Sequence, residues 1–350
     1  MIIVGVDAHK RTHTLVAIDQ SGGKLKEKTV AATTAGHHEA LNWAISRFSD
    51  DLLWAVEDSR VNTRLLEHDL LGAQQRVVRV PTVLMAKVRR SARTWGKSDP
   101  IDALSVARAA LREPNLPVAE HDTETWELKL LMDRRDDLVG QRVAVMNRLS
   151  SRLHLIDPQV PAWNLTRSPG RQALQQWLTA SADTLISELA LEELADIDRF
   201  SRNIDALYNR ISKRVALLGS TLTGIAGCGD LTAARLICGT ANVTRFRDEA
   251  AFARYVGVAP VPAWSGSTRG RMVLTRSGNR AMNSALQTIA VVQIRLDTPG
   301  RRYYLRRLEG GDTKAGARRC LKRKICRSVF TRLLADHRRR QHADPRDSVV

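Results

Sequence analysis

The sequence predicts an α/β domain, then a long helical hairpin, then a mainly helical, strongly basic C-terminal domain. Short apolar runs that fit strands alternate with amphipathic runs that fit helices up to about residue 123. Beyond that point apolar residues recur at three- and four-residue steps, as in long helices. The expected domains are residues 1–123, 124–220 and 221–335, followed by a disordered tail at 336–350.

Charged residues are distributed unevenly along the chain. Residues 1–123 carry 17 Lys and Arg against 15 Asp and Glu, and residues 124–220 carry 13 against 13. Residues 221–350 carry 25 against 9, a net charge of +16. A basic block of this size, composed mostly of arginine, indicates a polyanionic partner, of which nucleic acid is the best match.

Strand-like and helix-like runs alternate through the first domain. The expected strands are residues 2–7, 14–19, 24–31, 52–57 and 76–80, and the expected helices are residues 37–48 and 61–71. Gly22 and Gly23 form a turn, so the first three strands are expected to be antiparallel hairpins. Such an order fits a sheet that mixes antiparallel and parallel strands.

Two heptad-like apolar stripes predict the helical hairpin, which resembles a coiled coil. The first stripe comprises Val139, Val143, Met146, Leu149, Leu153 and Ile156. The second comprises Leu194, Ile197, Ile204, Ile211, Val215 and Leu218. A proline-bearing stretch from Pro158 to Pro169 separates them. The balanced charge of the region predicts that the hairpin packs on itself or on another protomer.

The basic domain contains two glycine-rich segments. Residues 223–229 precede an apolar helix, as in hairpins whose backbone N–H groups meet DNA phosphates. Residues 255–271 hold hydroxyls and arginines between prolines and glycines, and a helix follows at 281–292. Hydroxyls between guanidinium groups suit either phosphate binding or nucleophilic attack on phosphate.

Four acids are the candidate catalytic residues. Asp7 and Glu57 each end an apolar strand-like run, and Asp99 and Asp102 open an amphipathic helix that has Leu104 on its apolar face. Residues three apart on a helix face the same way, so all four carboxylates can surround one Mg²⁺ ion. The helix start also fits plain capping, with Asp99 as N-cap and Asp102 favoured by the helix dipole.

A basic segment leads into the acidic pair. It contains Lys87, Arg89, Arg90, Arg93 and Lys97. These cations fit a clamp on a nucleic-acid backbone beside the acids, and equally a solvated loop.

Composition indicates a cytoplasmic protein that does not enter the membrane. No run approaches 18 apolar residues, and the chain opens with a strand pattern, not a signal peptide. Cys228, Cys238, Cys320 and Cys326 form no Cys-x-x-Cys pair, so they are expected to be reduced and mostly buried thiols.

Taken together and in order, these motifs resemble the DEDD transposases of insertion-sequence family one-ten, relatives of the Piv DNA invertase. The resemblance covers residues 1 to about 335. It rests on Gly5-Val6-Asp7-Ala8-His9-Lys10, Glu57, Lys97-Ser98-Asp99-Pro100-Ile101-Asp102-Ala103, Gly257-Val258-Ala259-Pro260, Ser265-Gly266 and Ser277-Gly278-Asn279.

The resemblance implies a RuvC/RNase H-like domain followed by a transposase domain with a catalytic serine. Asp7, Glu57, Asp99 and Asp102 would hold Mg²⁺, and Ser265 would attack a DNA phosphodiester. Ser267 is a close competitor for that role and Ser277 a distant one. The nucleic-acid contacts would include Lys10, the basic segment, Arg269, Arg271, Arg276, Asn279 and Arg280.

The implied activity is recombination that moves an insertion sequence. Its partners would be donor and target DNA, a structured bridge RNA that pairs with both, and further copies of the chain in a dimer or tetramer. Two other interpretations remain. One is a RuvC-type junction nuclease whose acids activate water, and the other is a non-catalytic nucleic-acid-binding protein.

Overall fold

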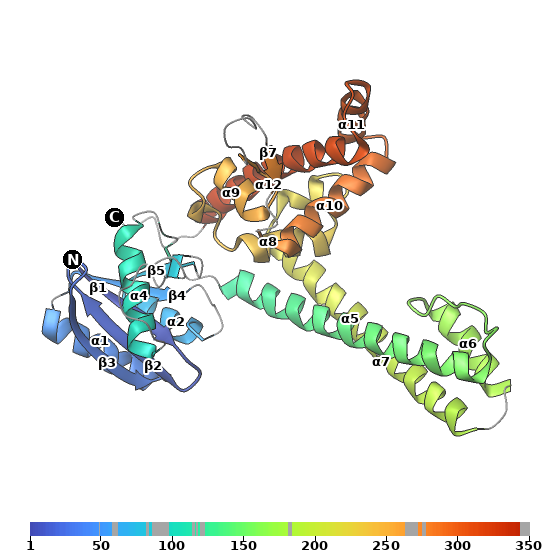
Figure 1. The fold of residues 1–350 in the computed structure, drawn as a ribbon, viewed down its shortest axis with the longest axis horizontal. Coiled ribbons are helices and arrows are strands. Elements are labelled where there is room, and N and C mark those ends of the chain that lie inside the picture. The colour runs from blue at the N-terminus through green and yellow to red at the C-terminus, as the bar shows by residue number, and fades with distance from the viewer. Residues whose placement is uncertain are drawn as a thin grey trace. The chain divides into compact units, whose positions relative to one another are not determined.

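The computed structural model divides the chain into two compact units (Figure 1). Unit 1 comprises Met1–His121 and Thr244–Asp248, and unit 2 comprises Asp122–Val243 and Glu249–Val350. The structure describes residues 1–48, 50–57, 62–81, 84–85, 98–113, 116, 118–119, 123–180, 184–262, 272–274 and 278–343. Each unit is taken by itself below.

Unit 1 is built on a mixed five-stranded sheet. Its strands are β1 (Ile2–Ala8), β2 (Thr12–Ile18), β3 (Lys24–Ala31), β4 (Leu52–Glu57) and β5 (Arg76–Val80). The strand order is β3-β2-β1-β4-β5, in which β1, β2 and β3 are antiparallel and β4 and β5 run parallel to β1. The antiparallel hairpins expected from the sequence are therefore confirmed, and the five strand positions agree within two residues.

Helices cover both faces of this sheet. They are α1 (Thr34–Phe48), α2 (Arg64–Gly72) and α4 (Asp99–Arg112). Alternate strand residues point to opposite faces, and the burial follows this rule: Ile3 packs in the cluster that includes α4, whereas Val4 packs in the cluster that includes α1 and α2. The sheet therefore has an α4 face and an α1/α2 face.

The α1/α2 face buries two histidines as well as apolar residues. His13 on β2 and His37 on α1 are each 1% exposed, and their rings stack with centroids 5.1 Å apart. His37 Nδ1 lies 2.6 Å from a carboxylate oxygen of Asp69 on α2. Burial, assisted by the neighbouring His37, lowers the pKa of His13 from its usual 6.5 to about 4.

This lowered pKa predicts that unit 1 loses stability in mild acid. The unfolded chain binds a proton at His13 between pH 6.5 and 4 while the folded chain does not, so stability falls as pH falls through that window. The loss in the free energy of unfolding approaches about 3 kcal/mol near pH 4. His13→Gln should remove this part of the pH dependence, measured by pulse proteolysis in urea with mass spectrometry of unit 1 peptides. His38→Gln, which changes an exposed histidine of α1, is the control and should leave the slope unchanged.

Two long helices dominate the first half of unit 2. Helices α5 (Thr123–Ile156) and α7 (Leu185–Leu217) pack along each other. All six residues of the second predicted stripe are buried. In the first stripe Leu149 and Leu153 are buried, but Val143 is 48% exposed. Val145 is buried instead, because it stands four residues before buried Leu149 and shares its face of the helix, whereas Val143 stands six residues before Leu149 and does not.

A third helix of this region was not predicted. Helix α6 (Ser168–Ala180) begins at the proline-bearing stretch that the sequence analysis treats only as a separator. Pro169 lies in its first turn, where a proline costs no helical hydrogen bond. Leu174 and Leu178 are buried against α7, and the Trp163 and Trp177 rings lie with their centroids 5.6 Å apart.

The rest of unit 2 is mostly helical. Its elements are α8 (Asp230–Thr240), α9 (Glu249–Val256), the hairpin β6 (Pro260–Pro262) and β7 (Met272–Leu274), α10 (Arg280–Arg295), α11 (Pro299–Glu309) and α12 (Lys314–Ala343), with a 3₁₀ turn at Thr221–Gly224. A second 3₁₀ turn, Val243–Arg245, begins in unit 2 and ends in the Thr244–Asp248 segment of unit 1. Cys228 and Cys326 are buried thiols, and burial raises the pKa of each to about 12. All four cysteines are free, as expected.

The disordered tail predicted from residue 336 overlaps the last turns of a helix. Helix α12 continues to Ala343, and Asp336 within it is only 2% exposed. The Asp336 carboxylate accepts hydrogen bonds from the backbone N–H and the hydroxyl of Thr221, at 2.9 and 2.7 Å. This buried contact keeps the last turns of α12 against the 3₁₀ turn, and residues 344–350 lie outside the described residues. No helix in the described part of the chain is long and apolar enough to span a membrane.

Candidate active site

Strand pairing places two of the predicted acids at one edge of the sheet. Val6 on β1 pairs with Val56 on the parallel strand β4, so Asp7 and Glu57 occupy the next position on each strand. Both residues fall on the alternation that puts Ile3 and Leu53 on the α4 face. The carboxyl ends of the two strands therefore present Asp7 and Glu57 toward the same face.

A glycine brings the other two acids to that place. If Gly5 carried a Cβ atom, it would lie 2.2 Å from the carbonyl oxygen of Ala103 and 2.6 Å from the amide nitrogen of Ala107. The α4 backbone therefore lies directly on β1, an approach that any other residue would prevent. This contact sets the first turn of α4, with Asp99 and Asp102, beside the end of β1.

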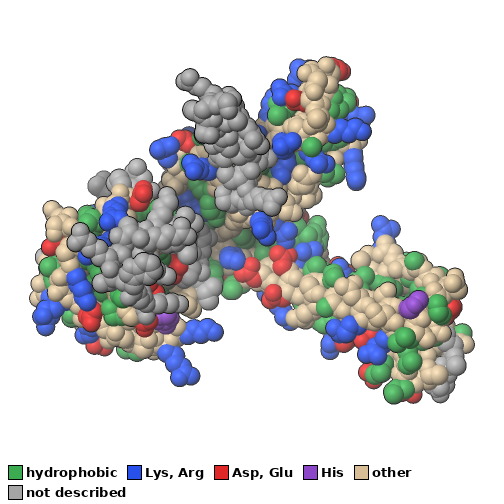
Figure 2. Space-filling model, in the orientation of Figure 1, with side chains coloured by type: hydrophobic (Ala, Val, Ile, Leu, Met, Phe, Trp, Pro, Cys, Tyr) green, Lys and Arg blue, Asp and Glu red, His purple; other side chains and the backbone are tan. Residues whose placement is uncertain are grey.

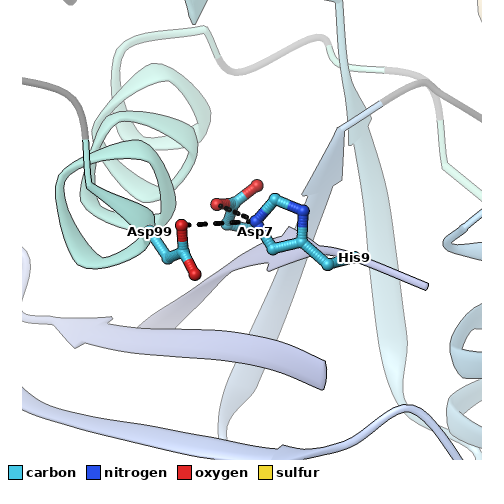
Figure 3. Close-up of side chains that lie close together, drawn as sticks. All are labelled: Asp7, His9 and Asp99. Carbon is cyan, nitrogen blue, oxygen red and sulfur yellow. Dashed lines mark hydrogen bonds and ion pairs between the residues drawn. The ribbon is translucent and has the colours of Figure 1, made fainter. Parts of the chain in front are cut away.

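Three side chains converge at this point (Figure 3). His9 Nε2 lies 3.1 Å from Asp7 Oδ2 and 3.4 Å from Asp99 Oδ1. One ligand atom from each of these residues lies within 4.8 Å of the other two, a spacing that allows them to share a metal ion. Asp7 is 8% exposed, whereas His9 and Asp99 are exposed.

The electrostatics of the cluster favour a bound cation. Burial raises the pKa of Asp7 above its usual range; His9 opposes the rise, and the carboxylates of Asp102 and Asp99 add to it. Asp102 is itself buried, at 7% exposure. Like charges that are held together away from water are costly, and a divalent cation with oxygen ligands removes that cost. The donor set therefore fits a divalent metal.

The structure corrects the capping interpretation of Asp99. The N-cap position of α4 belongs to Ser98, whose side chain makes no capping hydrogen bond, and Asp99 is the first helical residue. The Asp99 carboxylate instead contacts His9. Asp102 remains in the first turn, where the helix dipole favours an acid in any case.

His9 is the residue of the cluster that the sequence analysis did not assign. It stands two positions after Asp7, and residues two apart at a strand end point to the same face. The Asp-x-His spacing at the end of an apolar strand was therefore the available signal. It was overlooked because a single exposed histidine has no partner that sequence alone can identify.

Many predicted site residues lie outside the described residues. These are the three serines, Ser265, Ser267 and Ser277; three arginines, Arg269, Arg271 and Arg276; and the basic segment, Lys87, Arg89, Arg90, Arg93 and Lys97. Lys10 and Arg280 are described and exposed. Asn279 is the N-cap of α10, since its side chain accepts a hydrogen bond from Met282 N at 3.1 Å and donates one to the Tyr255 hydroxyl at 3.3 Å.

Two protein-family models match the chain. A model described as "Transposase" matches residues 4–158, and a model described as "Transposase IS116/IS110/IS902 family" matches residues 219–305. The chain belongs to this transposase family. The acid cluster lies within the first match and the helical region around α8–α10 within the second.

Proteins of insertion elements are similar along nearly the whole chain. The "Insertion element IS900 uncharacterized 42 kDa protein" of Mycobacterium paratuberculosis is 26% identical, over 95% of this chain and 95% of that protein. The "Insertion element IS116 uncharacterized 44.8 kDa protein" of Streptomyces clavuligerus is 26% identical, over 87% of this chain and 88% of that protein. This IS110-type transposase therefore corresponds to those relatives along most of their length.

Solved structures of Thermus thermophilus RuvC are similar to part of the transposase. One covers 34% of this chain and 100% of that chain at 14% identity, with a TM-score of 0.28. Another, "T. thermophilus RuvC in complex with Holliday junction substrate", covers 32% and 94% at 15% identity, with a TM-score of 0.26.

The contact at Gly5 predicts a strongly destabilising substitution. Gly5→Ala places a methyl group against the α4 backbone, which cannot rotate away, so α4 must shift. We expect the free energy of unfolding of unit 1 to fall by about 3 kcal/mol or more. Urea unfolding, followed through unit 1 peptides, measures the change. Gly72→Ala is the matched control, because a Cβ atom there meets nothing within 4 Å. Equal stability of the two variants would contradict the close approach of α4.

Proposed function

We propose that this transposase cuts and rejoins DNA strands with two sets of groups: a divalent cation, Mg²⁺, on Asp7, Glu57, Asp99 and Asp102, and the hydroxyl of Ser265. The observation that carries the proposal is the convergence of Asp7 and Asp99 beside buried Asp102, at a helix–strand contact that Gly5 alone permits. The strand order and sense also support a RuvC/RNase H-like fold for residues 1–123.

The acids have a defined task in this mechanism. A divalent cation supplies a Lewis acid that stabilises negative charge on a phosphodiester oxygen. Asp7 and Glu57 would hold the cation from the sheet, and Asp99 and Asp102 would hold it from α4. Because sheet and helix are packed backbone to backbone, the carboxylates would be preorganised for that role.

The serine chemistry follows from the family resemblance. The Ser265 hydroxyl would attack phosphorus, form a serine phosphodiester and release a DNA strand whose oxygen takes up a proton. A strand from the second duplex would then attack the same phosphorus and free the serine. Arg269, Arg271 and Arg276 would neutralise the charge that develops on the phosphoryl oxygens. Ser267 and, more remotely, Ser277 are the alternative nucleophiles.

Helix α11 supports the assignment of nucleic-acid binding to residues 221–335. None of its residues is buried, and it exposes Arg301, Arg302, Arg306 and Arg307. Figure 2 shows Lys and Arg side chains gathered over this part of unit 2. The ammonium group of Lys324 lies over the Tyr303 ring, 4.6 Å from the ring centroid. Lys324 therefore adds a cation to the same surface. A helix that buries none of its residues fully and exposes four arginines suits contact with phosphates.

The helix pair α5/α7 is the proposed self-association element. We assign it as a coiled coil that joins copies of the chain in a dimer or tetramer, since recombination must bring two duplexes together. Leu130, Val143 and Tyr208 support this, because they are apolar and between 41% and 49% exposed on these two helices. A structured bridge RNA as the guide rests on the family resemblance alone.

The nucleophile can be tested with a covalent trap. Ser265→Ala should bind DNA normally but form no protein–DNA adduct in denaturing gels, because only one hydroxyl is lost. Asp99→Asn should also form no adduct, since it removes a cation ligand while the N-cap at Ser98 is kept. Peptide mapping of the wild-type adduct identifies the attached residue. Attachment at Ser267 or Ser277 would assign the role of nucleophile to that serine instead of Ser265.

A different product would support the second candidate function. Because the acid cluster is complete within unit 1, the chain could also act as a metal-dependent nuclease that uses water. Metal-dependent cleavage with free strand ends and no adduct on any residue would establish that activity and reject the serine mechanism.

The arginines of α11 predict a change in salt dependence. The double variant Arg301→Gln/Arg306→Gln should bind duplex DNA with a log–log salt slope about 2 units shallower, because each lost phosphate contact removes about 0.9. Fluorescence anisotropy across a range of salt concentrations measures the slope. Arg199→Gln/Arg202→Gln, which removes two exposed arginines of α7, is the control. Equal slopes for the two double variants would exclude α11 from the interface.

A further inference from the structure

The two contacts of His9 share one nitrogen atom. Nε2 faces Asp7 Oδ2 at 3.1 Å and Asp99 Oδ1 at 3.4 Å, and both dashed lines of Figure 3 reach that atom. An imidazole nitrogen carries one proton at most, so it cannot donate a well-directed hydrogen bond to both carboxylates. Three ligand atoms that converge on one position are instead the arrangement that binds a metal ion.

The separations agree with that arrangement. Adjacent ligand atoms on a six-coordinate cation with bonds of about 2.1 Å stand about 3 Å apart. The two separations from Nε2, 3.1 and 3.4 Å, lie close to that value. All three ligand atoms lie within 4.8 Å of one another, as sharing one ion requires.

The backbone holds His9 in this position. His9 follows β1, and its N–H donates to the carbonyl oxygen of Thr12 at 3.0 Å, which closes the tight turn between β1 and β2. Asp7 and His9 therefore project from one strand end toward the same face, opposite Asp99 on α4. The ring is half exposed, so an ion can reach it from solvent.

We propose that His9 is a nitrogen ligand of the cation in the acid cluster, and that the site consequently prefers Mn²⁺ to Mg²⁺. This inference rests on the metal site of the proposed function: Mg²⁺ still binds there, and the added nitrogen ligand gives Mn²⁺ the higher affinity. Mg²⁺ takes oxygen ligands almost exclusively, whereas imidazole nitrogen raises the affinity for first-row transition ions. Mn²⁺ accepts carboxylate oxygen as readily as Mg²⁺ does and tolerates the added nitrogen.

Pulsed electron paramagnetic resonance of the full-length chain loaded with Mn²⁺ alone tests the ligand directly. We expect nitrogen couplings to the Mn²⁺ spectrum in the wild type and in His38→Ala, and none in His9→Ala. Calorimetry should show that His9→Ala weakens Mn²⁺ binding by about tenfold or more and changes Mg²⁺ binding by less than about twofold. Circular dichroism confirms that each variant is folded.

The outcomes separate this inference from the proposed site. Mn²⁺ that binds without nitrogen coupling, and is lost in Asp7→Asn, would leave the acid site standing and reject His9 as a ligand. Tighter binding of both ions by His9→Ala would likewise reject it and identify His9 as a competitor for the carboxylates. Binding of neither ion by the wild type, or binding unaffected by Asp7→Asn, would overturn the site and the inference together.

Discussion

The candidate site depends on the contact between the α4 backbone and Gly5. A side chain at that position would overlap the carbonyl of Ala103 and the amide of Ala107. Without it, the helix approaches the central strand closely enough for its first turn to meet the end of β1. The acids of two distant segments thereby come together on elements that cannot move independently, which is how a preorganised site keeps its geometry.

The central sheet buries ionisable groups on both faces. On the α4 face, burial raises the pKa of Asp7, and on the α1/α2 face, burial lowers the pKa of His13 to about 4. In each case burial disfavours the charged form. The two positions differ in what surrounds them. Asp7 lies among other possible ligand atoms near solvent, whereas His13 lies against a second buried histidine that pairs with Asp69.

In unit 2, the buried apolar stripe and the exposed arginines of α11 belong to different helices. Helices α5 and α7 bury a continuous apolar stripe and carry ion pairs on their surface, such as Arg148 with Glu193. Helix α11 contributes no buried residue and exposes four arginines. Between these regions, buried Asp336 of α12 binds the turn at Thr221 that connects α7 to α8. The cationic surface therefore belongs to a helix that buries none of its side chains fully.

The sequence alone determined the strands and helices of residues 1–80 and the buried stripe of α7, because apolar periodicity reports which face an element buries. It also identified Asp7, Glu57, Asp99 and Asp102 as candidates from their places at element ends. It missed α6, placed Val143 in the core and began the disordered tail inside α12, because burial along a helix depends on which other segments pack against it. Only the tertiary structure showed that Ser98 occupies the N-cap position of α4 and that His9 contacts Asp7 and Asp99. Those facts follow from the approach of α4 to Gly5, a contact between segments about 100 residues apart that no local pattern encodes.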